Sequence, residues 1–233
     1  MKTFVQNGTV VNAHGAQKAD VLLEGGRIGA VAPSIEATAG MRIVDARGCF
    51  VLPGFIDTHT HFDLDLGYTK TADDFCTGTA AAVLGGTTSV IDFATQEPNG
   101  TLAQALAAWH EKARGSSCNY AFHMALARWD GETEAELPAM SAAGVTSYKM
   151  YMVYDGLRVN DGEIYSALKA ALKQNALLGV HCENWDVLCR RIDEVKASGL
   201  TGPMGHPLSR PSPVEAEAVA RLMRIAQLAQ APC

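Results

Sequence analysis

Two histidines spaced two residues apart are the first feature of this sequence that could perform chemistry. His59 and His61 lie in the stretch GFIDTHTHFD, at the end of an apolar run, in a chain that has only seven histidines. We interpret this stretch as a β-strand, and side chains two apart on a strand point to the same face. Two imidazoles at that spacing can bind one metal ion from one side. Two packed or hydrogen-bonded histidines satisfy the spacing equally well, so the motif alone leaves both interpretations open.

Two more polar residues lie at the ends of otherwise apolar stretches. Lys149 lies near the end of SYKMYM, and His181 ends LLGVH in the next predicted strand. Lysine is rarely buried without a partner, so its position requires an explanation. The carboxyl ends of parallel strands meet at one edge of a sheet, where barrel enzymes hold their active sites. We therefore predict that these two residues share one site with the histidines of the first strand.

Repeated strand and helix patterns would position this site. From Phe55 onward, short apolar stretches alternate with helical stretches such as TLAQALAAWHEKARG and DGEIYSALKAALKQN. Such repeats predict an α/β fold with a parallel sheet covered by helices. The candidates are a (β/α)8 barrel and an open doubly wound sheet, and no G-x-G-x-x-G follows the first strand to support the second. About five βα units are present, whereas a whole barrel needs about 250 residues.

The remaining predictions concern turns and helix ends. Residues 1–52 contain short β-prone stretches, with a hairpin predicted at Asn7-Gly8 and two strands predicted around Gly25-Gly26, and are interpreted as a β module ahead of residues 53–233. Asp161 is the predicted N-cap of one helix. Ser212-Pro213-Val214-Glu215 is the predicted capping box of the last helix, and residues 202–212 before it are predicted to form a loop.

Composition argues against several classes of partner. The formal charge of −6 and the lack of a basic stripe argue against nucleic acid. No stretch resembles a membrane span, and the start MKTFVQNGTV has no apolar segment of a secretory signal. Six scattered cysteines without a C-x-x-C pair indicate reduced thiols in a cytoplasmic protein.

Five longer motifs extend over essentially the whole chain. They are PGFIDTHTHFD, GGTTSVIDFA, SYKMYMVYDGLRVNDGEIY, GVHCEN and HPLSRPSPVEAEAV. In combination they resemble the cyclic amidohydrolases, most closely the dihydropyrimidinase or hydantoinase branch. The resemblance implies a (β/α)8 TIM barrel of the amidohydrolase type with a small β-sandwich domain, to which residues 1–52 would contribute.

The resemblance also implies a role for each candidate residue. His59 and His61 match the H-x-H that binds the more buried of two divalent metal ions, zinc or alternatively manganese. Lys149 matches the lysine that takes up CO2 to become a carbamate bridging both ions. His181 matches a ligand of the second ion, and Tyr154 matches the residue that hydrogen-bonds the oxyanion of the substrate.

The implied reaction is hydrolysis of dihydropyrimidines or 5-substituted hydantoins to N-carbamoyl amino acids by a hydroxide shared between the metals. An allantoinase-like or dihydroorotase-like reaction is an alternative, and so are a non-catalytic scaffold of the same fold and a metal-binding structural fragment. The presence of all four metal-binding positions favours an enzyme over the scaffold. The expected partners are a small cyclic ureide or imide and further copies of the chain, in a homodimer or homotetramer.

The sequence departs from the family pattern at Cys233. In the family, later strands bring another metal-binding histidine and an aspartate that binds metal and acts as general base. We therefore expect this chain to correspond to the N-terminal part of such an enzyme, and residues 1–233 alone to be inactive.

Three further residues have two interpretations each. Asp57 shares a face with the histidine pair, and Glu183 shares a face with His181, so each either supports its neighbour or belongs to the barrel core. His123, inside the third predicted strand, is expected to be a packed or hydrogen-bonded histidine.

Overall fold

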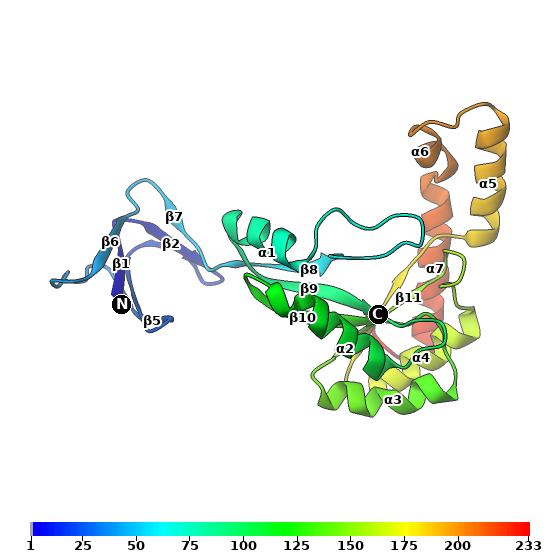
Figure 1. The fold of residues 1–233 in the computed structure, drawn as a ribbon, viewed down its shortest axis with the longest axis horizontal. Helices are drawn as coiled ribbons and strands as arrows, with labels where there is room; N and C mark the ends of the chain where they lie inside the picture. The colour runs from blue at the N-terminus through cyan, green and yellow to red at the C-terminus, as the bar shows by residue number, and fades with distance from the viewer. Residues whose placement is uncertain (1) are drawn as a thin grey trace. The chain divides into compact units, whose positions relative to one another are not determined.

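The structure, a computed structural model, describes residues 2–233. The chain divides into two compact units, Met1–Phe55 and Ile56–Cys233. The second unit carries all the candidate site residues, and most of its elements are labelled in Figure 1. No helix within residues 2–233 combines the length and apolar character that crossing a bilayer requires.

The first unit consists of short strands in two sheets, with the orders β5-β4-β1-β6 and β3-β2-β7. The strands are β1 (Lys2–Gln6), β2 (Thr9–Asn12), β3 (Gly15–Lys18), β4 (Asp20–Glu24), β5 (Arg27–Ala32), β6 (Arg42–Asp45) and β7 (Phe50–Val51). The two strands predicted around Gly25-Gly26 are confirmed as β4 and β5, which pair antiparallel, and both glycines between them have positive φ.

The hairpin predicted at Asn7-Gly8 is wrong. β1 pairs with β4 and β6, whereas β2 pairs with β3 and β7, so the two strands belong to different sheets. Asn7 has a φ of 64°, and its side chain donates a 2.9 Å hydrogen bond to Asp45. The left-handed conformation that favours a tight hairpin turn also allows the chain to leave one sheet for another. Long-range pairing decides between these outcomes.

The second unit is built on one five-stranded sheet with the order β12-β11-β10-β9-β8. The strands are β8 (Phe55–Thr60), β9 (Thr87–Thr95), β10 (Asn119–Ala125), β11 (Ser147–Tyr151) and β12 (Leu177–His181). The helices are α1 (Phe75–Leu84), α2 (Leu102–Lys112), the short 3-10 helix η1 (Ala113–Gly115), α3 (Gly131–Ala142), α4 (Asp161–Lys173), α5 (Trp185–Ala197), α6 (Gly205–Ser209) and α7 (Ser212–Ala229). β9 to β12 pair in parallel, and the strand order follows the chain without the reversal of a doubly wound sheet. The predicted fold class, part of a (β/α)8 barrel with a small β module, is confirmed.

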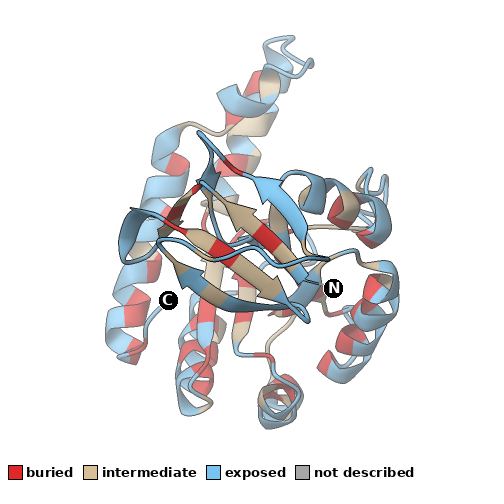
Figure 2. Ribbon diagram, turned by 90° about the vertical axis from the view of Figure 1, so that its left-hand side faces the viewer, coloured by how far each residue is buried: buried red, intermediate tan, exposed pale blue. Residues whose placement is uncertain are grey.

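Alternation along β11 separates the core from the candidate site. Tyr148 and Met150 are buried in a core that also contains Ile164 and Leu168 of α4. Lys149 lies between them in sequence and therefore points to the opposite face of the sheet. Figure 2 shows that buried residues occur on both the strands and the helices. The apolar core thus covers the face of β11 opposite the side chain of Lys149.

Two helix starts differ from the predictions. Asn160, not Asp161, caps α4, because its side chain accepts a 3.0 Å hydrogen bond from the backbone N–H of Glu163. Helix α7 begins at Ser212 after Pro211, and no side chain caps it, so the predicted box with Glu215 is wrong. A cap requires extended backbone just before the helix, and the residues that have it lie one position earlier than predicted. Part of the predicted loop at residues 202–212 is the short helix α6.

The cap of α3 makes a measurable contribution to stability. Asp130 accepts a 2.8 Å hydrogen bond from the backbone N–H of Thr133, and this bond lowers the pKa of the Asp130 carboxyl. We expect Asp130→Ala to reduce the free energy of unfolding by about 1 kcal/mol near neutral pH. A carboxyl with a lowered folded-state pKa stabilises the fold above its unfolded-state pKa, and this contribution is lost as pH falls through the folded-state pKa. The difference between the two proteins should therefore shrink in acid.

Urea unfolding followed by circular dichroism at neutral and acidic pH would measure this difference. Asp130→Asn is the matched control, because asparagine caps helices as well as aspartate does but carries no titrating carboxyl. An Asp130→Ala protein as stable as the wild type at neutral pH would contradict the prediction.

Candidate metal and active site

The histidine pair lies at the carboxyl end of β8. The ring centroids of His59 and His61 are 5.1 Å apart, and both rings pack against Phe93 of β9, at 4.6 and 4.9 Å. Partial burial lowers the pKa of His59 most, and the positive charge of Lys149 lowers it further, although much of the surface of His59 is exposed. Burial likewise lowers the pKa of the half-buried His61. Two largely neutral imidazoles, the form that binds metal ions, therefore lie side by side.

Lys149 extends from β11 toward the same region. Burial lowers the pKa of its amine, which favours the neutral form. The positive charge of Lys149 in turn lowers the pKa of both histidines of the pair, so its amine lies close to them. Its Nζ is also 5.6 Å from the centre of the Tyr151 ring. Among residues 2–233 we find no carboxylate that forms an ion pair with this amine.

His181 forms a second group at the end of β12. Its Nε2 lies 2.8 Å from Glu183 Oε1 and 3.5 Å from the hydroxyl of Tyr154. The other carboxylate oxygen, Glu183 Oε2, is 3.3 Å from Arg210 Nε, an ion-pair distance that lacks the angles of a hydrogen bond. The ring of Tyr151 lies roughly parallel to that of His181, with 6.4 Å between centroids. The carboxylate therefore orients the imidazole, and the ring of Tyr151 neighbours both His181 and the amine of Lys149.

Tyr154 has an unusual backbone conformation in the loop after β11. Its φ is 77°, in the left-handed region that residues with a Cβ rarely occupy. The loop is closed by hydrogen bonds from the backbone N–H groups of Leu157 and Arg158 to the Tyr154 carbonyl, at 3.2 and 3.0 Å. Burial raises the pKa of Tyr154 most, and the negative charge of Glu183 raises it further. Its hydroxyl is therefore a neutral donor near His181, and strain of this kind is frequent at functional sites.

The side chains gathered here have the chemistry of a metal site. They combine imidazoles, which are usual metal ligands, with a lysine amine, which is not. Within residues 2–233, no three His, Cys, Asp or Glu side chains are grouped closely enough to hold a metal ion. The donors that the fold brings together are the histidine pair, the partly buried amine of Lys149 and, next to Tyr151, His181. The neutral imidazoles of the histidine pair fit a divalent metal ion, and the amine of Lys149 lies beside them without a carboxylate partner among residues 2–233.

Asp57, Glu183 and His123, whose roles the sequence left open, form hydrogen bonds at the site. Asp57 is exposed and accepts a 3.1 Å hydrogen bond from the backbone N–H of His59, and Glu183 contacts the ring of His181. The ring of His123 contacts the hydroxyl of Ser147 and, at 2.9 Å, the carbonyl of Thr58. The prediction that His123 is a packed or hydrogen-bonded histidine is confirmed.

Three residues of this region were not among the candidate site residues identified from the sequence. Phe93 contacts both rings of the histidine pair, Asp92 contacts the chain beside them, and Arg210 contacts Glu183. A carboxylate inside the apolar stretch TTSVIDFA was a usable signal for Asp92. Arg210 lies in a stretch predicted as a loop, and its sequence context offers no comparable signal.

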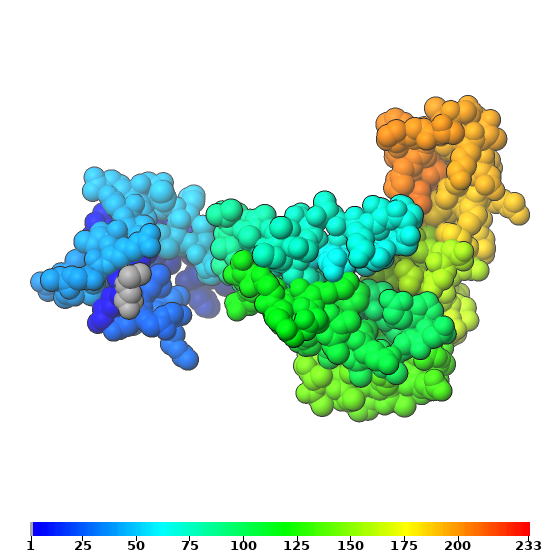
Figure 3. Space-filling model, viewed as in Figure 1, coloured from blue at the N-terminus to red at the C-terminus, as the bar shows by residue number. Residues whose placement is uncertain are grey.

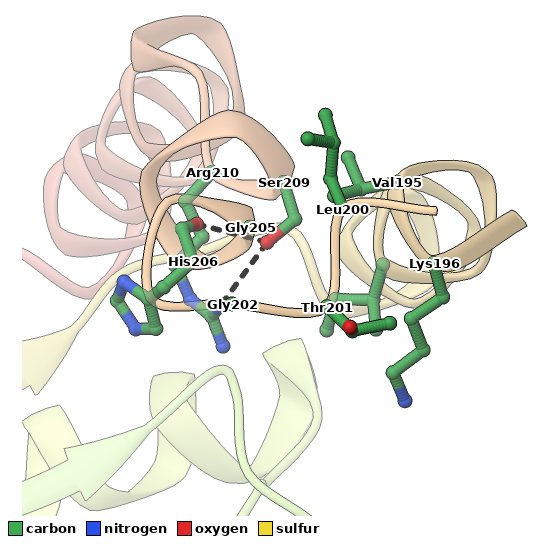
Figure 4. Close-up of a pocket in the computed structure, with 10 residues that line it drawn as sticks. Val195, Lys196, Leu200, Thr201, Gly202, Gly205, His206, Ser209 and Arg210 are labelled. Carbon is green, nitrogen blue, oxygen red and sulfur yellow. Dashed lines mark hydrogen bonds between the residues drawn. The ribbon is translucent and has the colours of Figure 1, made fainter. Parts of the chain in front are cut away.

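A separate hollow lies between α5 and α6, which extend beyond the rest of the second unit in Figure 3 (orange). Its volume is about 330 Å³, and Figure 4 shows Arg210 and His206 on its wall. Arg210 donates a hydrogen bond to Ser209 there and also lies against Glu183. This hollow contains none of the predicted metal-binding residues.

Parallel βα units with histidines and a partly buried lysine at the carboxyl ends of the strands define the class as an amidohydrolase-type barrel. The profile of the Amidohydrolase family matches residues 50–217, and the chain belongs to this family. The membership predicted from the motifs is thereby confirmed.

The chain is similar to hydantoinases and dihydropyrimidinases over nearly its whole length. It is 38% identical to the D-hydantoinase of Geobacillus stearothermophilus, covering 98% of this chain and 49% of that protein. It is 40% identical to the dihydropyrimidinase of Arabidopsis thaliana, covering 99% of this chain and 44% of that protein. The crystal structure of dihydropyrimidinase from Brevibacillus agri NCHU1002 superposes with a TM-score of 0.94 at 39% identity, covering 99% of this chain and 50% of that one. The chain thus spans about half the length of these relatives.

Proposed function

We propose that the protein containing this chain hydrolyses a cyclic amide bond in dihydropyrimidines or 5-substituted hydantoins, giving N-carbamoyl amino acids. The observation that carries this proposal is the neutral histidine pair beside the partly buried Lys149, in a chain similar throughout to hydantoinases and dihydropyrimidinases. We further propose that residues 1–52 belong to a small β-sandwich domain and residues 53–233 to the barrel. The whole protein should be a homodimer or homotetramer, which light scattering would measure.

The proposed site holds two divalent metal ions, zinc or manganese. His59 and His61 would bind one ion, His181 would bind the other, and Lys149 would contribute to both as a carbamate. When bound, the two ions supply a water nucleophile at neutral pH and polarise the amide carbonyl.

The environment of Lys149 supports the carbamate. Carbamate formation joins the neutral amine nitrogen to the carbon of CO2 and releases one proton from the nitrogen. The lowered pKa of the amine makes this neutral form available. The product carries anionic oxygen donors, which the histidine pair and His181 do not supply.

The chain's other residues would bind and orient the substrate. Tyr154, neutral because its pKa is raised, would donate a hydrogen bond to the carbonyl oxygen as negative charge develops there. Glu183, 2.8 Å from the ring of His181, would hold that ring in a fixed orientation.

A ring-opening assay tests the proposed function. The whole protein, supplied with zinc or manganese, would be given dihydrouracil, a 5-substituted hydantoin, allantoin or dihydroorotate, and the carbamoyl product would be quantified. We expect turnover of the first two substrates. Turnover of allantoin or dihydroorotate alone would assign a sibling reaction, and no turnover of any ring would indicate a scaffold protein.

Removal of one imidazole should weaken metal binding. We expect His59→Ala to reduce metal affinity by about 100-fold, because the remaining histidine cannot hold the ion from two positions. Elemental analysis of the purified protein after dialysis against a chelator would measure this loss. His110→Ala, an exposed histidine of α2, is the matched control. Full metal content in folded His59→Ala protein would remove this residue from the site.

A further inference from the structure

We propose that Asp92 is a positioning residue for the histidine pair, an inference that rests on the metal site of the proposed function. Asp92 lies on β9 and is only 1% exposed. A buried carboxylate is costly unless hydrogen bonds satisfy its oxygens. Its bonding partners therefore indicate its role.

One oxygen of Asp92 holds the chain on both sides of His61. Oδ2 accepts a 2.9 Å hydrogen bond from the hydroxyl of Thr60 and a 2.8 Å hydrogen bond from the backbone N–H of Phe62. Strand β8 ends at Thr60, so beyond it the Asp92 carboxylate, and not a neighbouring strand, accepts the hydrogen bond of the Phe62 backbone N–H. The backbone that carries His61 is thereby fixed to β9.

The other oxygen fixes the carboxylate itself. Oδ1 accepts hydrogen bonds from the indole N–H of Trp109, at 3.0 Å, and from the backbone N–H of Phe93, at 2.8 Å. Trp109 lies on α2 and is buried in the core. Each oxygen thus meets two donors. An asparagine would turn an NH2 group toward one of these pairs, so only a carboxylate accepts all four bonds.

Phe93, the residue after Asp92, contacts the histidine pair on the face of the sheet opposite the Asp92 side chain. Adjacent side chains on a strand point to opposite faces, so Asp92 and Phe93 point away from each other. The ring of Phe93 contacts both imidazoles of the pair, and Asp92 holds the backbone between and beyond them. The two residues together set the spacing of the imidazoles before any metal ion binds, and such outer contacts tune metal affinity.

Metal affinity distinguishes positioning from simple core stability. Co²⁺ binding to the purified whole protein would be measured by competition with a chelator, and the Co²⁺ absorption spectrum would report its coordination. We expect Asp92→Asn to weaken binding by about 10- to 100-fold and to change the spectrum. Thr60→Val, which removes one of the four donors, should cause a smaller loss in the same direction.

Thr79→Val is the matched control, because it also removes a buried hydroxyl with two hydrogen bonds. Thr79 lies on α1 and bonds to Phe75 and Ser117, neither of which belongs to the site. It should lower stability while leaving Co²⁺ affinity and spectrum unchanged.

Wild-type affinity and an unchanged spectrum in Asp92→Asn would overturn the positioning role. If Asp92→Asn does not fold, equal Co²⁺ affinities of Thr60→Val and Thr79→Val would overturn it instead. Wild-type whole protein that binds no Co²⁺ would overturn both this inference and the proposed metal site, so the two failures are distinguishable.

Discussion

Replacement of Lys149 by alanine is expected to abolish ring opening in the whole protein, with a loss of about 10³-fold or more in kcat/KM. The methyl group of alanine cannot form a carbamate, and the site loses the ligand proposed to join its two ions. Metal activation of water and of the carbonyl contributes several kcal/mol to such reactions, and each 1.36 kcal/mol is a factor of ten in rate. Steady-state kinetics together with elemental analysis would measure the loss of activity and of metal.

Three further measurements distinguish this role from a general effect of the mutation. Lys169→Ala, at an exposed position of α4, should retain wild-type kinetics. A short carboxylic acid added to Lys149→Ala should restore part of the activity, because it can supply an anionic oxygen in the space left by the side chain. NMR after incubation with ¹³C-bicarbonate should detect a carbamate in the wild type and none in the variant. Undiminished turnover of Lys149→Ala would rule out the proposed role.

Replacement of Tyr154 by phenylalanine should lower kcat by about 10²- to 10³-fold while leaving the metal content unchanged. The variant removes only the hydroxyl, so it tests the proposed contact with the developing oxyanion, a type of contact worth about 3–4 kcal/mol. The raised pKa of this tyrosine keeps the hydroxyl protonated at neutral pH, as a donor must be.

Tyr165→Phe is the control for this experiment, because Tyr165 is an exposed tyrosine on α4. An equal kcat for Tyr154→Phe and the wild type would remove Tyr154 from the mechanism. Loss of metal in Tyr154→Phe would instead indicate that the hydroxyl supports His181, 3.5 Å away.

The sequence by itself determined the parallel βα architecture of the second unit. The local alternation of apolar strands and helices predicted parallel βα units but left a barrel and a doubly wound sheet open. The resemblance to the amidohydrolases favoured the barrel, in which each strand pairs with the next strand along the chain. The positions of the candidate donors followed from the same pattern. His59 and His181 come at or near the ends of their strands, where parallel strands meet at one edge, and Lys149 lies inside the apolar stretch SYKMYM on the strand beside His181.

Only the tertiary structure decided the features that depend on partners distant in sequence. Asn7 has the local signal of a hairpin, yet the strands around it pair with different sheets. Asp92 binds Thr60, 32 residues away, and Trp109, 17 residues away. Glu183 meets Arg210 only because α6 and the end of β12 come together. Local periodicity reports which face a side chain occupies, whereas the donor that satisfies a buried or half-buried carboxylate is chosen by the packing of separate elements.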